Sequence, residues 1–174
     1  MKKKLFIGIG IFIAVLLFAF CFSDSINNFI RKDSKRYALC LYGENFHYTR
    51  GLEARYDKSG KLESIEVYLI YDNSAFEIAG SGKDPAEKYP EAKATYVMND
   101  DGSVKITNFL TAKSIEAGAL EDNAFYMVNS IYDKVETEDQ IKLFLEEQKE
   151  FAKENNIPAD GTNYIIMNGK NVKW

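Results

Sequence analysis

The chain has 174 residues and carries 22 lysines and arginines against 26 aspartates and glutamates, a net charge of −4 at pH 7. This acidic balance argues against nucleic acid and anionic membrane surfaces as partners, because both carry negative charge. With only two cysteines, Cys21 and Cys40, a fold held together by several disulfides is excluded.

The first segment of the chain predicts a membrane anchor. Lys2, Lys3 and Lys4 are followed by eighteen uncharged and mostly apolar residues, Leu5 to Phe22. A helix of this length spans about 27 Å, close to the hydrocarbon thickness of a thin bilayer. Because positive charge beside a first apolar segment resists translocation, the lysines are expected in the cytoplasm and the remaining chain outside it. We therefore expect a single-pass protein of the cell membrane that contacts the lipid bilayer through Leu5 to Phe22.

Two other fates of this segment remain open. A lipoprotein signal needs a small residue before the lipidated cysteine, whereas the bulky Phe20 precedes Cys21. A cleaved secretory peptide needs small residues one and three positions before the cut, and Cys21 with Ser23 meets this requirement poorly. We prefer an uncleaved signal anchor over residues 1–22, followed by a juxtamembrane linker at 23–35 and an extracytoplasmic domain at 36–174.

The part of the chain outside the membrane is long enough for one domain with a hydrophobic core. Without the three N-terminal lysines it has 19 basic and 26 acidic residues, a net charge of −7. Such a charge suits a basic partner, although it also serves solubility in many domains. Cys40 lies among aromatic and aliphatic residues and is expected to be a small buried hydrophobic residue.

Strands are predicted for the first part of this domain. The run Tyr37 to Tyr42 is rich in aromatic and aliphatic residues, and Gly51 to Leu62 alternates apolar and charged residues into a turn of Asp, Ser and Gly. The return strand, 63–72, has two distinct faces, because side chains alternate along a strand. The face expected in the core consists of Ile65, Val67, Leu69 and Tyr71. The other face carries Glu66, Tyr68, Ile70 and Asp72.

Helices and further hairpins are predicted for the rest. A loop is expected at 73–90, a second hairpin at 94–109, and a helix at 123–134, although that last segment also alternates like a strand. Thr137 and Gln140 form a capping-box pattern that begins a helix ending near Asn155. The Asn168-Gly169 pair predicts a C-terminal hairpin at the edge of the sheet. These elements indicate an α+β domain, with an antiparallel sheet built from hairpins and one or two amphipathic helices packed on one face.

The pattern of reactive residues argues against an enzyme. His47 is the only histidine, and its neighbours in the sequence supply no catalytic or zinc-binding partner. Gly80 to Lys83 lacks the first glycine of a phosphate-binding loop and the hydroxyl residue that should follow the lysine. Asn99 to Gly102 lacks the flanking acidic ligands of an EF-hand and is expected to be a turn. We therefore predict no catalytic residues, no metal ligands and no cofactor.

The apolar run Leu5 to Phe22, the polar linker and the hairpin Gly51 to Leu62 with its aliphatic return strand together resemble the TipC-type immunity proteins. Those are small membrane-anchored proteins of Gram-positive bacteria that protect the producing cell from a toxin exported by the type VII pathway. The resemblance implies a crescent-like sheet whose open face occludes a toxin domain outside the membrane. It also implies that this chain binds and blocks a secreted antibacterial toxin.

The return strand supplies the predicted contact residues for such a partner. Tyrosine suits a protein interface because it buries a large area while its hydroxyl still forms hydrogen bonds. The predicted partner-binding residues share the strand face opposite the core and are Glu66, Tyr68, Ile70 and Asp72. The alternative function is a small envelope binding protein, similar to bacterial lipoproteins, for an unknown ligand.

Overall fold

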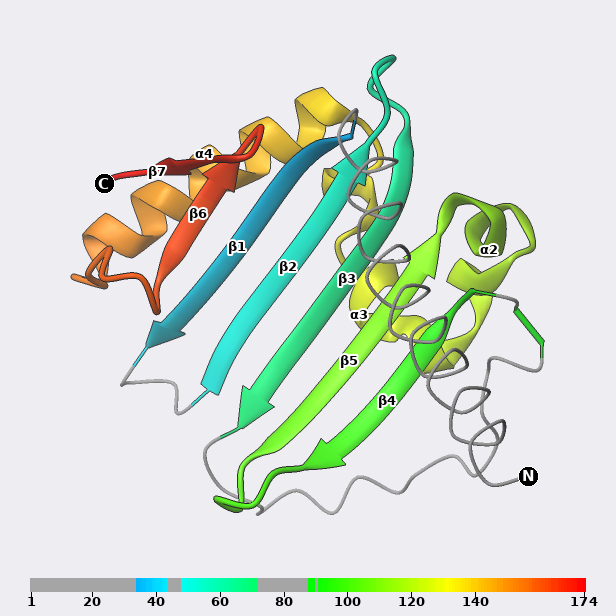
Figure 1. The fold of residues 1–174 in the computed structure, drawn as a ribbon, viewed down its shortest axis with the longest axis horizontal. Coiled ribbons are helices and arrows are strands. Elements are labelled where there is room, and N and C mark those ends of the chain that lie inside the picture. Colours follow the sequence, from blue (N-terminus) through cyan, green and yellow to red (C-terminus); the bar gives the residue numbers. More distant parts are fainter. Residues whose placement is uncertain (1–33, 44–47, 72–87, 90) are drawn as a thin grey trace, which may run out of the picture. The chain divides into compact units, whose positions relative to one another are not determined.

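The computed structural model describes residues 34–43, 48–71, 88–89 and 91–174 (Figure 1). Within the described chain, Lys35–Trp174 belong to one compact unit. The predicted anchor at Leu5 to Phe22, most of the predicted linker and most of the predicted loop at 73–90 lie outside the described residues. Among the helices that are described, none has the length and apolar character needed to cross a membrane.

Seven antiparallel strands form a single sheet in the order β4-β5-β3-β2-β1-β6-β7. The strands are β1 (Lys35–Gly43), β2 (Tyr48–Tyr56), β3 (Leu62–Tyr71), β4 (Lys93–Met98), β5 (Val104–Thr111), β6 (Tyr164–Met167) and β7 (Lys170–Val172). The three predicted hairpins are confirmed as β2-β3, β4-β5 and β6-β7, and the last of them joins the sheet through the pairing of β6 with β1. The α+β class with an antiparallel sheet is therefore confirmed.

The two helices α3 (Tyr126–Asn129) and α4 (Glu138–Glu154) pack behind this sheet in Figure 1, where α4 lies behind β1 and β6 and α3 lies behind β3. The helical elements are α2 (Ala112–Glu116), η4 (Ala119–Glu121), η5 (Asn123–Phe125), α3 (Tyr126–Asn129), η6 (Tyr132–Lys134) and α4 (Glu138–Glu154). At the start of α4 the Thr137 side chain accepts a hydrogen bond from the Gln140 backbone, and the Gln140 side chain accepts one from the Thr137 backbone. The predicted capping box is confirmed.

The prediction of one helix over 123–134 is wrong, because the segment is divided into the short elements η5, α3 and η6. Asn108 of β5 explains part of this division. Its side-chain oxygen accepts from the Met127 backbone N–H at 3.1 Å, and its side-chain nitrogen donates to the Ala124 carbonyl at 3.0 Å. These bonds use backbone groups that a continuous helix would pair internally.

The hydrophobic core lies between the helices and one face of the sheet. Alternate strand residues meet in rows across the sheet, and one such row joins Tyr37, Ala54, Ile65 and Leu110. Each of these side chains is at most 1% exposed. The α4 residues that complete this core are Ile141, Leu145 and Ala152, as the helical period predicts.

Polar contacts fix the start of α4 against β1. The Glu138 carboxylate accepts hydrogen bonds from the Lys35 ammonium and, at 2.6 Å, from the Tyr37 hydroxyl, and it also pairs with Lys142. The bonds from Lys35 and Tyr37 lower the pKa of Glu138 to about 2. Burial, together with the bond to Glu138, raises the pKa of Tyr37 to about 12.

Replacing Leu145 by Ala should lower the free energy of unfolding by about 2–5 kcal/mol, because the fully buried side chain leaves a cavity in the core. Leu143 on the same helix is 64% exposed, so Leu143→Ala serves as the control and should change stability by less than about 0.5 kcal/mol. Urea denaturation followed by circular dichroism measures both. Equal losses in the two variants would contradict the assigned burial of α4.

Glu138 should also make the free energy of unfolding depend on pH in the acidic range. Its pKa in the folded state is depressed, so its stabilising effect is complete above its ordinary pKa of 4.5 and is lost as the pH falls toward about 2. Glu138→Gln removes this titration, so its unfolding free energy should fall less between about pH 5 and about pH 2.5 than that of the unmodified chain. The neighbouring Asp139 side chain is 95% exposed, and Asp139→Asn should retain the full acid dependence.

Candidate functional site

The sheet face opposite α3 and α4, which we call the bare face, is the candidate site. Of the described helices, α3 and α4 pack on the other side and α2 follows the end of β5, so none of them crosses this face. Strand alternation and register place on it, among others, Arg36, Ala38, Cys40, Glu53, Arg55, Glu66, Tyr68, Ile70, Lys105, Thr107, Phe109, Tyr164 and Ile166. Among the predicted binding residues, Glu66, Tyr68 and Ile70 are therefore together, whereas Asp72 lies outside the described residues.

A row of four residues organises the centre of the bare face. The strand register aligns Tyr68, Gly51, Cys40 and Tyr164 on β3, β2, β1 and β6. A Cβ atom on Gly51 would lie only 1.9 Å from Cζ of Tyr68, so the Tyr68 ring occupies the space above the glycine. This position lets the ring extend across β2 toward Cys40 and Tyr164.

The environment of Tyr68 shows that its side chain is part of the structure of this face. Burial raises the pKa of Tyr68, and the nearby side chains of Cys40 and Tyr164 contribute in the same direction. The Lys105 ammonium lies 4.6 Å from the centre of the Tyr68 ring, within the range of a cation–π interaction. Tyr68 is therefore held from several sides before any partner arrives.

An ion-paired cluster lies beside this row. The two oxygens of the Glu53 carboxylate bind Arg36 at 2.8 Å and Arg55 at 2.6 Å. Burial acts to raise the pKa of Glu53, but the contacts with the two arginines outweigh it and the pKa falls below its ordinary value. The carboxylate of Glu53 therefore stays ionised, and the positive charges of the two arginines balance its negative charge.

Glu66 differs from Glu53 in this respect. It lies next to Glu53 on β2 and Phe109 on β5 in the register, and no described residue forms an ion pair or hydrogen bond with its side chain. Ile70 lies on the same strand between Thr49 and Lys105. The half-buried Glu66 and Ile70 thus offer an uncompensated carboxylate and an apolar group that a partner could contact.

Several residues of the bare face were not predicted from the sequence. Alternation along the second hairpin places Lys105 and Phe109 on a common face, but only the pairing of β5 with β3 brings them beside Ile70 and Glu66. The Arg36–Glu53 contact likewise depends on the pairing of β1 with β2. In the described part of the chain, His, Cys, Asp and Glu residues form no group of three that could hold a metal ion.

The contact between Gly51 and Tyr68 gives a test by a double-mutant cycle. Gly51→Ala should destabilise the chain by about 1–3 kcal/mol, because the added methyl group must displace the Tyr68 ring. In a Tyr68→Ala background the same change should cost little, so the cycle should give a coupling energy of about 0.5–3 kcal/mol. Chemical denaturation of the four proteins measures it. Additive effects would show that the ring does not lie over the glycine.

Comparison with known proteins gives no match for this chain, whether to a protein family, to a curated protein or to a solved structure.

Proposed function

We propose that this chain is an immunity protein, anchored in the cell membrane by Leu5 to Phe22, that binds and blocks a secreted antibacterial toxin outside the membrane. The observation that carries the proposal is the bare face, where Glu66, Ile70 and Phe109 lie together and no described helix covers them. A non-enzymatic role in binding a protein is the function that suits such a surface.

The composition of the bare face supports a protein partner. Interface centres combine aromatic and aliphatic groups with few charges, and their rims are polar. Phe109 and Ile70 supply apolar area, and Val97 on the adjoining edge strand β4 lies on the same face and is 50% exposed. A partner that covers these side chains removes apolar surface from water, which favours association.

The rigidity of the bare face supports tight binding. The Tyr68 ring already lies over Gly51 and beside Lys105, and Glu53 is already paired with two arginines. Side chains that are ordered before binding lose less conformational entropy when the complex forms. A larger share of the favourable contact free energy then remains as binding free energy.

The charge of the whole chain favours a basic partner, whereas the bare face itself carries Arg36, Arg55 and Lys105 beside Glu53 and Glu66. The residues that follow the N-terminal lysines carry a net charge of −7, which raises the encounter rate with a positively charged protein. Inhibition would be steric, because a toxin domain seated on the sheet could not reach its own substrate. The membrane anchor would keep the chain where an exported toxin arrives.

Charge reversal at Glu66 tests this proposal. The partner to use is an exported toxin encoded beside the gene for this chain, and Glu66→Lys should weaken its binding by at least about tenfold in a titration. Glu147→Lys on the exposed side of α4 is the matched control, with the same change of charge, and should leave the affinity unchanged. Equal affinities of the two variants, or the lack of a neighbouring gene for an exported toxin, would contradict the proposal.

A further inference from the structure

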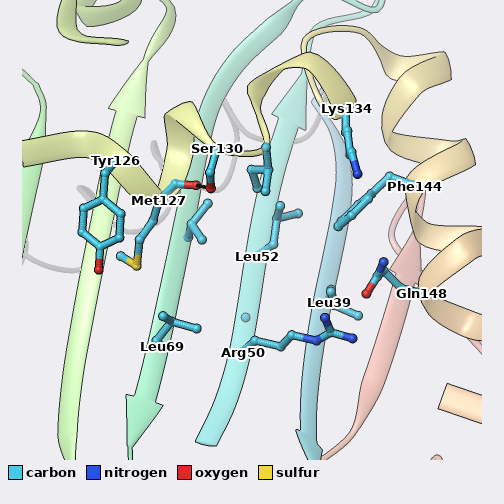
Figure 2. A pocket seen from close by; sticks show the side chains of 13 residues that line it. Leu39, Arg50, Leu52, Leu69, Tyr126, Met127, Ser130, Lys134, Phe144 and Gln148 are labelled. Carbon is cyan, nitrogen blue, oxygen red and sulfur yellow. Dashed lines mark hydrogen bonds between the residues drawn. The ribbon is translucent and has the colours of Figure 1, made fainter. Parts of the chain in front are cut away.

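A second site lies on the other side of the sheet, in a pocket of about 410 Å³ between the sheet and the helices. Figure 2 shows β1, β2 and β3 forming its floor, with Tyr126, Met127 and Ser130 on one side and Phe144 and Gln148 of α4 on the other. The volume falls within the usual range for small-molecule sites, about 300–1,000 Å³.

The lining of the pocket is apolar except for a few polar groups. Its apolar side chains include Leu39, Leu52, Val67, Leu69, Met127 and Phe144. Arg50 and Lys134 also line it, and no aspartate or glutamate does so among the described residues. In a chain with more acidic than basic residues, this is a local concentration of positive charge.

Arg50 is the most unusual of these residues. Its side chain runs from β2 along the floor toward Gln148, as Figure 2 shows, and its Nη2 atom is buried with no hydrogen-bond acceptor among the described residues. Burial lowers the pKa of Arg50, so the positive charge is held in an unfavourable environment. Arg50 as a whole is only half-buried, but a buried donor without an acceptor still costs free energy unless something binds it.

The geometry of Arg50 leaves its hydrogen-bond donors available. The guanidinium carbon lies over the Phe151 ring, 4.5 Å from its centre, and a contact with the ring face uses none of the N–H donors as a hydrogen bond to an oxygen would. The N–H donors lie in the guanidinium plane, where a carboxylate or phosphate can accept two of them at once. Gln148 also lines this end of the pocket, where its side-chain nitrogen can donate a hydrogen bond to an anion.

We infer that this pocket binds a small amphipathic anion, with its carboxylate or phosphate head on Arg50 and its linear apolar tail over the leucines and Met127. Charge complementarity selects the head, because the only charged groups that line the pocket among the described residues are cations. The apolar lining selects the tail, because burial of a hydrocarbon chain there removes it from water. Such a ligand supplies the acceptor that Arg50 lacks.

Calorimetric titration of the full chain in lipid nanodiscs, with empty nanodiscs as the blank, tests this site. The probes are octanoate, octyl phosphate and 1-octanol, which share a tail and differ in the head. At least one of the two anions should bind saturably, with one molecule per chain and more tightly than octanol. Tighter binding of octanoate would indicate a fatty acid, and tighter binding of octyl phosphate would indicate a lipid-like phosphate.

Arg50→Gln should weaken binding of the anion by about ten- to hundredfold, because it removes charge-assisted hydrogen bonds, and should leave octanol binding unchanged. Lys93→Gln is the matched control, since it removes one positive charge from an exposed position on β4 and should change nothing. Ser130→Trp places a large ring at the exposed rim of the pocket and should reduce binding of all three probes.

If Arg50→Gln does not fold, Ser130→Trp and the preference for an anion over octanol decide the outcome. The inference is wrong if no anion binds saturably, if octanol binds as tightly as both anions, or if the binding of anions is unchanged in every folded pocket variant.

Discussion

The structure depends on a hydrophobic layer that the helices share with only one face of the sheet. Ile65 and Leu110 in neighbouring strands, and Ile141 and Leu145 on α4, have no exposed surface within it. Cys40 is a free cysteine, and no disulfide joins the described residues. The main stabilising free energy therefore comes from burial of apolar area, at roughly 25 cal/mol per Å². The contacts of Glu138 fix where α4 begins on this layer.

This one-sided packing leaves the two faces of the sheet with different properties. On the bare face, Gly51 lets Tyr68 lie across β2, and two arginines pair with Glu53 whereas no described residue pairs with Glu66. On the helix-covered face, a pocket remains between α3 and α4, and among its described lining residues no carboxylate accompanies Arg50. The bare face therefore suits a large partner, and the pocket suits a small one.

Much of the fold could be predicted because it follows from local patterns. Alternation along 63–72 identified both faces of β3, the capping box identified the start of α4 at Thr137, and the Asn168-Gly169 pair identified the last hairpin. Each signal involves residues close together in the chain, whose geometry is set by strand or helix period and by turn chemistry. The same alternation placed Glu66, Tyr68 and Ile70 on one side of the candidate site.

The sequence by itself thus determined the class of the domain and the composition of each strand face. The tertiary structure decided which strands are neighbours, and with that the position of Tyr68 over Gly51 and the joining of β6 to β1. It also decided that Asn108 binds the backbone of the segment after α2 and that Arg50 lies against Phe151 of α4. These contacts join residues far apart in the chain, and no local period or propensity specifies which distant partners meet.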